Sequence, residues 1–365
     1  MTTQATQTPA PAKKPKRPPG AVEEWAAYLL ARGAASVIGA LRPSDAITLA
    51  QAAGRGLYHI DRRHRERTLW QLRIAFPELS EPQRERLAHR CFQHLLLLAA
   101  EVVLTPRLVH RDNWPGMIRV GPGIGDAIEL LNRGKPCILL TGHLGNWEVL
   151  GNTLALLGYK VAALARPLPH QRVNRWLLAI REARGMRIIT KFEATDSMHA
   201  VLNAGGLLAF IADQNAGRRG VHVPFFNRLA STYKSIALMA MHYRTPVIVG
   251  GSPRFTGEGP QPVQFGLVVT DIIQPEDWES QPDPLFYITA RYTRGLETLV
   301  RRHPDQYLWM HRRWKTRPRH EQDGKPMPAP LRRKLEALPW MTPADLLELE
   351  KPVDYQAITR GRLKF

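Results

Sequence analysis

The stretch Cys137-Ile138-Leu139-Leu140-Thr141-Gly142-His143-Leu144-Gly145-Asn146-Trp147-Glu148 decides the fold. Its apolar start has the length of a central β-strand, and the apolar spacing after it predicts a helix that ends at Gly158. The turn between them puts His143 at the carboxyl end of the strand, where open α/β sheets bind ligands. Glu148 falls in the first helical turn. Positions five apart on one helix point about 140° apart, so only a strand-turn-helix junction can bring this histidine and this acid together.

A histidine beside a carboxylate can take a proton from a hydroxyl group. The neutral imidazole accepts the proton, and the carboxylate on the other ring nitrogen fixes the tautomer and stabilises the imidazolium. The spacing of His143 and Glu148 also suits a structural histidine in a turn and an acid that favours the helix dipole. From spacing alone, a general base and a structural turn both stay open.

The stretch resembles the His-x4-acid motif of glycerolipid acyltransferases, and more closely that of the late acyltransferases of lipid A biosynthesis. Three further blocks carry this resemblance in the family's order. They are residues 73–80 with Phe-Pro-Glu, Asp213-Gln214-Asn215 followed by residues 223–226 and 230–232, and residues 307–318 with Trp-Met-His-Arg-Arg-Trp-Lys-Thr-Arg-Pro. Together the blocks span most of residues 22 to 320.

The resemblance implies an enzyme that moves a fatty acyl chain from a thioester of acyl carrier protein or coenzyme A to a hydroxyl of a glycolipid, most simply a lipid A precursor. It implies that His143 is the general base and that Glu148 orients it, with no cofactor and no metal. The residues expected to contact substrate are Asn146, Trp147, Arg166, Asp213, Gln214, Arg312 and Arg313. Acyltransferases of mannosylated lipids share the Gly-Asn-Trp-Glu form, so the acceptor, the acyl length and the carrier stay open.

Two of these residues follow predicted strands, like His143. Arg166 comes after the apolar run 160–165, so it should face the same rim and can clamp a phosphate with two N–H groups. The alternative is a surface arginine. Asp213 comes after the run 207–212 and can orient either the histidine or the acceptor. At the start of the predicted helix, the backbone amides near Gly145 and Asn146 are expected to stabilise a developing oxyanion.

Two aromatic residues, Phe225 and Phe226, stand next to each other in a predicted loop. They suit either the core or a wall for the acyl chain. The two cysteines, Cys91 and Cys137, lie among apolar residues without metal-ligand spacing, so we expect buried thiols in a reducing compartment. Other catalytic templates fail, because the glycine patterns match no nucleophile elbow, dinucleotide loop or Walker loop.

The composition predicts a globular protein with an anionic partner. The chain has 365 residues, of which 44% are hydrophobic, and 51 Lys and Arg against 32 Asp and Glu give a net charge of +19. Such an excess suits nucleic acid, an anionic membrane surface or phosphorylated substrates. The family resemblance favours membrane and phosphorylated glycolipid, with no nucleic acid expected. The alternative of another class is a basic, non-catalytic protein that binds membranes or RNA.

The order of apolar runs predicts an α/β fold with a mixed, largely parallel sheet flanked by helices and preceded by a helical segment. Predicted strands cover residues 137–141, 160–165, 187–190, 207–212, 246–252 and 263–273. Predicted helices cover residues 123–132, 146–157, 172–184, 197–203, 232–243 and 285–302. The expected parts are a disordered basic tail (1–20), a membrane-interacting helix (21–42), a helical region (43–114), the acyltransferase domain (115–320) and a C-terminal extension (321–365).

The segment 22–41 is apolar but interrupted by Arg32, so no run of 18 apolar residues remains to predict a confident membrane span. It suits an amphipathic helix in the headgroup region, with Trp25 and Tyr28 as anchors, or a soluble packing helix. We therefore expect the protein at the cytoplasmic face of the inner membrane, peripheral or with a single N-terminal anchor.

Overall fold

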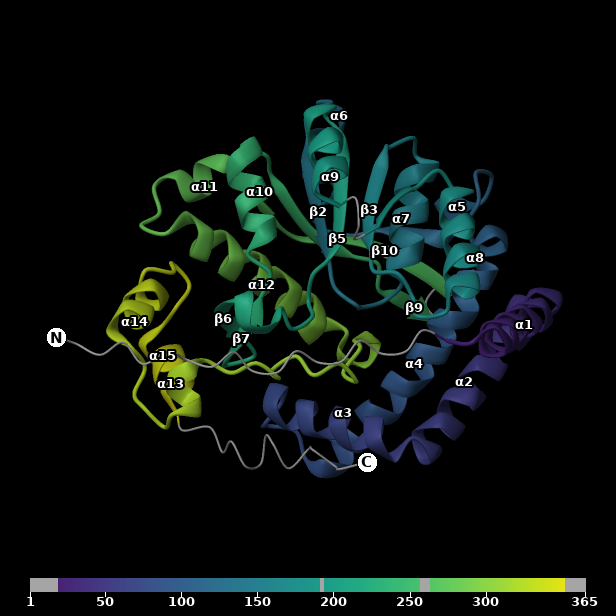
Figure 1. The fold of residues 1–365 in the computed structure, drawn as a ribbon, viewed down its shortest axis with the longest axis horizontal. Helices are drawn as coiled ribbons and strands as arrows, with labels where there is room; N and C mark the ends of the chain where they lie inside the picture. Colours follow the sequence, from purple (N-terminus) through teal and green to yellow (C-terminus); the bar gives the residue numbers. More distant parts are fainter. Residues whose placement is uncertain (1–18, 191–193, 257–262, 352–365) are drawn as a thin grey trace.

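The computed structural model describes residues 19–190, 194–256 and 263–351. Within them, a mixed and largely parallel central sheet is flanked by helices and preceded by a helical segment, which confirms the predicted α/β class (Figure 1). Nearly all of the expected basic tail (1–20), and residues 352–365 of the expected extension, lie outside the described residues.

Eight strands form the central sheet of the described chain. They are β1 (Ile118–Val120), β2 (Cys137–Thr141), β3 (Val161–Ala165), β4 (Arg187–Thr190), β5 (Leu207–Ile211), β8 (Val247–Gly251), β9 (Arg254–Thr256) and β10 (Val263–Ile273). Six of them match the predicted strands, with ends that differ by at most one residue. The prediction missed the three-residue strands β1 and β9, which are too short to show a period.

A separate two-stranded hairpin consists of β6 (Val221–Phe225) and β7 (Arg228–Thr232). The prediction of a loop for Val223–Phe226 was wrong over most of this segment. Pro224, which lacks an N–H, is tolerated because the hairpin has only two strands, so one side of each strand carries no ladder partner. Phe225 and Phe226 are buried in the core, as one of the two sequence readings expected.

The strand order is β1-β10-β8-β2-β5-β3-β4, with β9 on β10. Strand β2 lies between β8 and β5 and runs parallel to both. The chain leaves β2 toward β3 and returns to β5, and it later reaches β8 on the other side of β2. This reversal makes the carboxyl end of β2 a topological switch point, the usual place of a ligand site in such sheets.

Side-chain alternation along β2 divides the apolar interior between the two faces of the sheet. Ile138 and Leu140 belong to the larger core, together with residues of α9 (Ala194–Asn203), α10 (Ser235–Tyr243) and α12 (Pro284–Arg302). Cys137 and Leu139 belong to the second core, together with α6 (Ile124–Asn132) and α7 (Trp147–Leu156). Both cysteines are free and buried, as expected.

The N-terminal helices pack as a layer beside the sheet (Figure 1). They are α1 (Ala21–Ala40), α2 (Pro43–Ile60), α3 (Arg62–Ala75) and α4 (Glu81–Leu108), followed by the short α5 (Trp114–Met117). Helix α4 begins after Ser80, whose backbone N–H donates to the Gln83 side chain in a capping box. A short α11 (Pro275–Glu279) precedes α12.

The C-terminal extension contributes α13 (Arg319–Gln322), α14 (Ala329–Glu336) and α15 (Pro343–Glu350). Leu335, Leu338, Leu346 and Leu349 are buried and join the larger core. The described part of this extension therefore packs on the body of the fold.

Helix α1 has no buried residue and presents apolar side chains such as Leu29 and Leu30 to its surroundings. It is held against α8 (Gln171–Glu182) because Glu24 accepts hydrogen bonds from the backbone N–H groups of Gln171 and Arg172. Among the described helices, only α4 is long and apolar enough to cross a membrane, and 50% of its apolar window is buried inside the protein.

Candidate active site

His143 lies just beyond the carboxyl end of β2 and bonds to Asp213, which lies just beyond β5. Its Nδ1 is 2.7 Å from Oδ1 of Asp213, and its backbone N–H donates to Oδ2 at 3.0 Å. An ionised carboxylate only accepts hydrogen bonds, so Nδ1 carries the proton and Nε2 of the neutral ring is an acceptor. The Gln214 amide nitrogen lies 3.4 Å from Nε2.

The electrostatics of this pair favour a basic histidine. Burial lowers the pKa of His143, but the negative charge of Asp213 and its hydrogen bond outweigh burial and raise that pKa above its ordinary value. Burial likewise raises the pKa of Asp213, yet His143, through its charge and its two hydrogen bonds, brings it down to about 2. Asp213 is therefore ionised at neutral pH and holds the imidazole in one tautomer.

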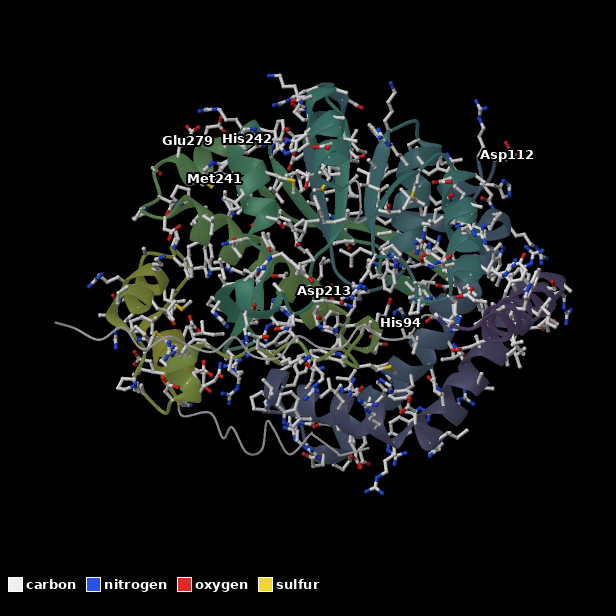
Figure 2. The ribbon with its side chains drawn as sticks, in the orientation of Figure 1. His94, Asp112, Asp213, Met241, His242 and Glu279 are labelled. Atoms are coloured by element: carbon white, nitrogen blue, oxygen red, sulfur yellow. The ribbon has the colours of Figure 1, made fainter. Side chains whose placement is uncertain are left out.

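Asp213 has further partners inside the protein, near the centre of the molecule (Figure 2). The buried Tyr307 lies near it, and burial followed by the Asp213 charge raises the pKa of Tyr307 well above its ordinary value. Arg313 adds a buried positive charge nearby. The guanidinium of Arg313 is itself held by the Ser231 carbonyl, at 2.6 Å, and by the Thr232 hydroxyl, at 2.7 Å.

Glu148 does not take the place beside Nδ1 that the sequence prediction gave it. Its carboxylate accepts hydrogen bonds from Arg181 of α8, one of them at 2.9 Å, and from the indole N–H of Trp147 at 3.2 Å. The contact expected for Glu148 is instead made by Asp213, because α7 begins at Trp147 and turns the Glu148 side chain toward α8. The paired acid thus comes from the neighbouring strand.

A cavity of about 660 Å³ opens beside His143, which is within the range of small-molecule pockets. His143, Trp147, Glu148, Arg181 and Gln214 line its polar end. The remaining walls come mainly from apolar side chains of β2, β3, β4 and β5 and of the facing helices α7 and α8. These residues include Leu139, Leu150, Val161, Ala163, Leu177, Met186, Ile188, Ala209 and Ile211. Small alanines on β3 and β5 leave the space that larger side chains would fill.

Of four other residues that were expected to contact substrate, two line the cavity and two do not. Trp147 and Arg166 line the cavity, and Arg166 is exposed at its rim after β3, as the sequence predicted. Asn146 and Arg313 do not line it. Asn146 is completely buried with both side-chain polar atoms bonded, so it cannot touch a substrate in this conformation.

Arg312 also lies outside the cavity, in the turn that follows His311. The Arg67 side chain of α3 donates to the carbonyl of Met310, which precedes His311, at 3.2 Å, and the positive charges of Arg67 and Arg312 repel each other. The His311 Nε2 accepts from the Asn215 backbone N–H. Burial is the largest cause that lowers the pKa of His311 to about 4.

The backbone amides expected to form an oxyanion site are already bonded. Gly145 N–H donates to the Gln306 carbonyl at 3.0 Å, and Asn146 N–H donates to the Ser252 carbonyl at 2.7 Å. That expectation was wrong, because these two amides anchor the turn to other segments of the chain. The Gln214 side-chain amide, beside His143, is one of the hydrogen-bond donors that line the cavity.

Sequence reasoning missed Arg181 and Tyr307 as members of the site. Arg181 ends an amphipathic helix in which several arginines alternate with apolar residues, so nothing in the pattern singles it out. Tyr307 starts the C-terminal block that carried the family resemblance, which was the one signal available. Among residues 19–190, 194–256 and 263–351, no group of three or more His, Cys, Asp or Glu residues could hold a metal ion.

Comparison with known proteins gives one family. The family model described as bacterial lipid A biosynthesis acyltransferase matches residues 17–316. Lipid A biosynthesis acyltransferase 2 of Shigella flexneri is 22% identical over 284 residues, covering 75% of this chain and 84% of that protein. The lipid A biosynthesis myristoyltransferase of Escherichia coli K12 is 24% identical over 312 residues, covering 80% and 88%. The family-model match spans the candidate site.

Proposed function

Since the chain belongs to the bacterial lipid A biosynthesis acyltransferase family and is an acyltransferase, we propose that it moves a fatty acyl chain from a thioester donor to a hydroxyl of a lipid A precursor. The donor is acyl carrier protein or coenzyme A carrying the chain. The single observation that supports this reaction most strongly is the His143–Asp213 pair at the mouth of an apolar cavity.

In the proposed mechanism His143 acts as general base. Nε2 removes the proton of the acceptor hydroxyl while its oxygen attacks the thioester carbonyl. The new C–O bond forms, the C–S bond breaks, and the imidazolium returns the proton to the leaving thiolate. No covalent acyl-enzyme is required, because the two substrates meet in one site. Asp213 stabilises the imidazolium during the reaction and keeps Nε2 directed toward the cavity.

The cavity supports the placement of the acyl chain. Its walls on the sheet and on α7 and α8 are largely apolar, which suits a fatty acyl chain with the thioester at the His143 end. The Gln214 amide would donate to the developing oxyanion. In this proposal Glu148 orients Arg181 at the polar end and Arg166 binds a phosphate at the rim, as its exposure and lack of a carboxylate partner among the described residues allow.

The lipid substrate implies work at a membrane surface, and α1 supports this. Its exposed apolar residues, the net charge of +19 and its contact with α8, a wall of the cavity, suit an anionic leaflet. We place the enzyme at the cytoplasmic face of the inner membrane, where acyl carrier protein and coenzyme A thioesters are available.

The test is an acyl-transfer assay with purified protein in detergent. Labelled acyl carrier protein and coenzyme A thioesters are offered with tetra-acylated Kdo-lipid A precursor and with lyso-phospholipids, for the wild type and for His143→Ala. We expect transfer to the lipid A precursor that His143→Ala abolishes while the circular dichroism spectrum stays the same. Folded wild-type protein that transfers to none of these acceptors contradicts the proposal, and transfer to lyso-phospholipid alone changes the acceptor.

A further inference from the structure

A buried ion pair contacts the turn that carries His143 but does not line the cavity. It joins Glu101 of α4 to Arg254 at the start of β9, through hydrogen bonds from two guanidinium nitrogens to both carboxylate oxygens. Their side chains are 0% and 4% exposed. Neither residue lines the cavity, so neither can touch a substrate there.

Asn146 connects this pair to the turn. Its amide nitrogen donates to Oε2 of Glu101 at 2.8 Å, and its amide oxygen accepts from the Val149 N–H at 2.9 Å as the N-cap of α7. Its backbone N–H donates to the Ser252 carbonyl, two residues before Arg254. Asn146 comes three residues after His143, so its side chain links Glu101 of α4 to the turn that carries the proposed base.

Gln306 closes the connection on the other side. Its side chain accepts from the Arg254 backbone N–H at 2.7 Å and donates to the Arg254 carbonyl at 2.8 Å. Its own carbonyl accepts from Gly145 N–H at 3.0 Å. Glu101, Arg254, Gln306, Gly145 and Asn146 thus form a closed ring of contacts, which we call the turn clamp.

Stability alone does not explain why the turn clamp contains two buried charges. A buried ion pair is often no more stabilising than apolar side chains of the same volume, because both charges lose their hydration. What such a pair does supply is direction, since two hydrogen bonds between a planar guanidinium and a planar carboxylate fix both groups. The Asn146 amide therefore donates to a carboxylate whose orientation is already fixed by Arg254.

His94 supports this account of the clamp. His94, labelled in Figure 2, belongs to α4 and comes seven residues before Glu101 in the sequence. Its Nδ1 is 3.0 Å from Nη1 of Arg254. Burial, followed by the charge of Arg254, lowers the pKa of His94 well below its ordinary value. The ring is therefore neutral and accepts from the guanidinium, which gives Arg254 a third fixed contact on α4.

We propose that the Glu101–Arg254 pair, acting through Asn146, positions the turn of His143 so that its imidazole meets Asp213 and the substrate correctly. Glu101, Arg254 and Asn146 are positioning residues for the reaction. This inference rests on the proposed role of His143. A loosened turn moves the ring relative to Asp213, and a displacement on the order of 1 Å costs about 100-fold in rate.

The main test is Asn146→Ser. A serine is a good N-cap and keeps an acceptor for Val149 N–H, but it is too short to reach Glu101. We expect kcat to fall roughly 10- to 100-fold, with KM for the thioester near the wild-type value and the unfolding temperature little changed. The double variant Glu101→Gln/Arg254→Met removes both charges without leaving one unpaired, and we expect the same loss of kcat.

The matched control is Asp271→Asn/Arg291→Met. These residues form another bidentate pair, between β10 and α12, which is away from the turn. We expect kcat per folded molecule to stay at the wild-type value in this control, whatever happens to its stability.

A second measurement is independent of turnover. The pKa of His143 is measured by NMR on protein with 13C-labelled histidine, with His143→Ala for assignment. We expect Asn146→Ser to bring this pKa down from its raised value, because the Asp213 contact weakens. Wild-type kcat and wild-type His143 pKa in Asn146→Ser would overturn the inference. If the wild type transfers no acyl chain at all, the proposed function fails, and the NMR arm still tests the clamp.

Discussion

Thr141 and Ile211 are register partners in the neighbouring parallel strands β2 and β5. Each ends its strand, so the residues two positions further on, His143 and Asp213, emerge at the same edge of the sheet and meet at 2.7 Å. The backbone bond from Ala212 N–H to the Thr141 carbonyl extends the pairing one step beyond the strands. Strand register, and not helix geometry, therefore makes the proposed catalytic pair.

Asp213→Asn and Glu148→Gln separate the two acids that could serve His143. Asp213→Asn removes the negative charge beside Nδ1 and lets an amide donate to the ring, which favours the wrong tautomer. We therefore expect kcat to fall by about 10⁴-fold. Glu148→Gln only frees Arg181, and we expect a smaller loss. Steady-state kinetics with a labelled thioester measures both. A larger loss in Glu148→Gln than in Asp213→Asn would return the orienting role to Glu148.

The pH dependence of turnover follows from the raised pKa of His143. A general base works only when deprotonated, so kcat/KM should rise with pH, with a midpoint above the ordinary value of 6.5. In Asp213→Asn the midpoint should move down, because burial, which lowers the pKa, remains and the opposing charge is lost. A rate profile from pH 5 to pH 9 measures both midpoints, because this range extends about 1.5 units below and about 2.5 units above the ordinary histidine pKa. Identical midpoints would contradict the assignment.

The same pair makes folding stability depend on pH. The raised pKa of His143 gives a contribution that is present below its unfolded value and is lost as pH rises through the folded value. The pKa of Asp213, lowered to about 2, gives a contribution that is present above 3.8 and is lost as pH falls toward 2. Urea unfolding of wild type and His143→Ala should show a stability difference that is largest between pH 3.8 and 6.5, shrinks as pH falls toward 2, and shrinks again as pH rises through the folded pKa of His143. A constant difference would contradict the linkage.

Filling the cavity should shorten the acyl chain that the enzyme prefers. Ala209 lines the cavity from β5, and Ala209→Leu would occupy space there. Each methylene that can no longer be buried costs about 0.8 kcal/mol, so kcat/KM should fall more for long-chain donors than for short ones. Competition between thioesters of different chain length measures the shift. Ala99→Leu, at an exposed position of α4, is the control and should leave the preference unchanged.

Association with membranes should depend on the exposed face of α1. Leu29 and Leu30 are 61% and 75% exposed, so Leu29→Ser/Leu30→Ser should weaken binding to anionic vesicles without affecting the core. Cosedimentation with vesicles that contain phosphatidylglycerol measures this. Leu347→Ser changes an equally exposed leucine on α15 and should bind like the wild type. Equal binding by all three proteins would exclude α1 as the membrane contact.

The sequence determined what depends on neighbouring residues. Apolar runs of strand length and the spacing of the helices were sufficient for six strands, for the turn after β2 and for the α/β class, because these patterns are local. The same local pattern put His143 at the end of β2 and Arg166 at the end of β3. The order of motif blocks also indicated the acyltransferase family, which the family model over residues 17–316 confirms.

Only the tertiary structure decided which groups meet. Asp213 is 70 residues from His143, and Arg181 is 33 residues from Glu148, so neither contact has a local signal. The bonded amides of Gly145 and Asn146 depend on Gln306 and Ser252, which are also distant in sequence. Local periodicity fixes which face of an element is apolar, whereas strand order and register fix which side chains lie side by side. The choice of Asp213 over Glu148 beside His143 belongs to the second kind.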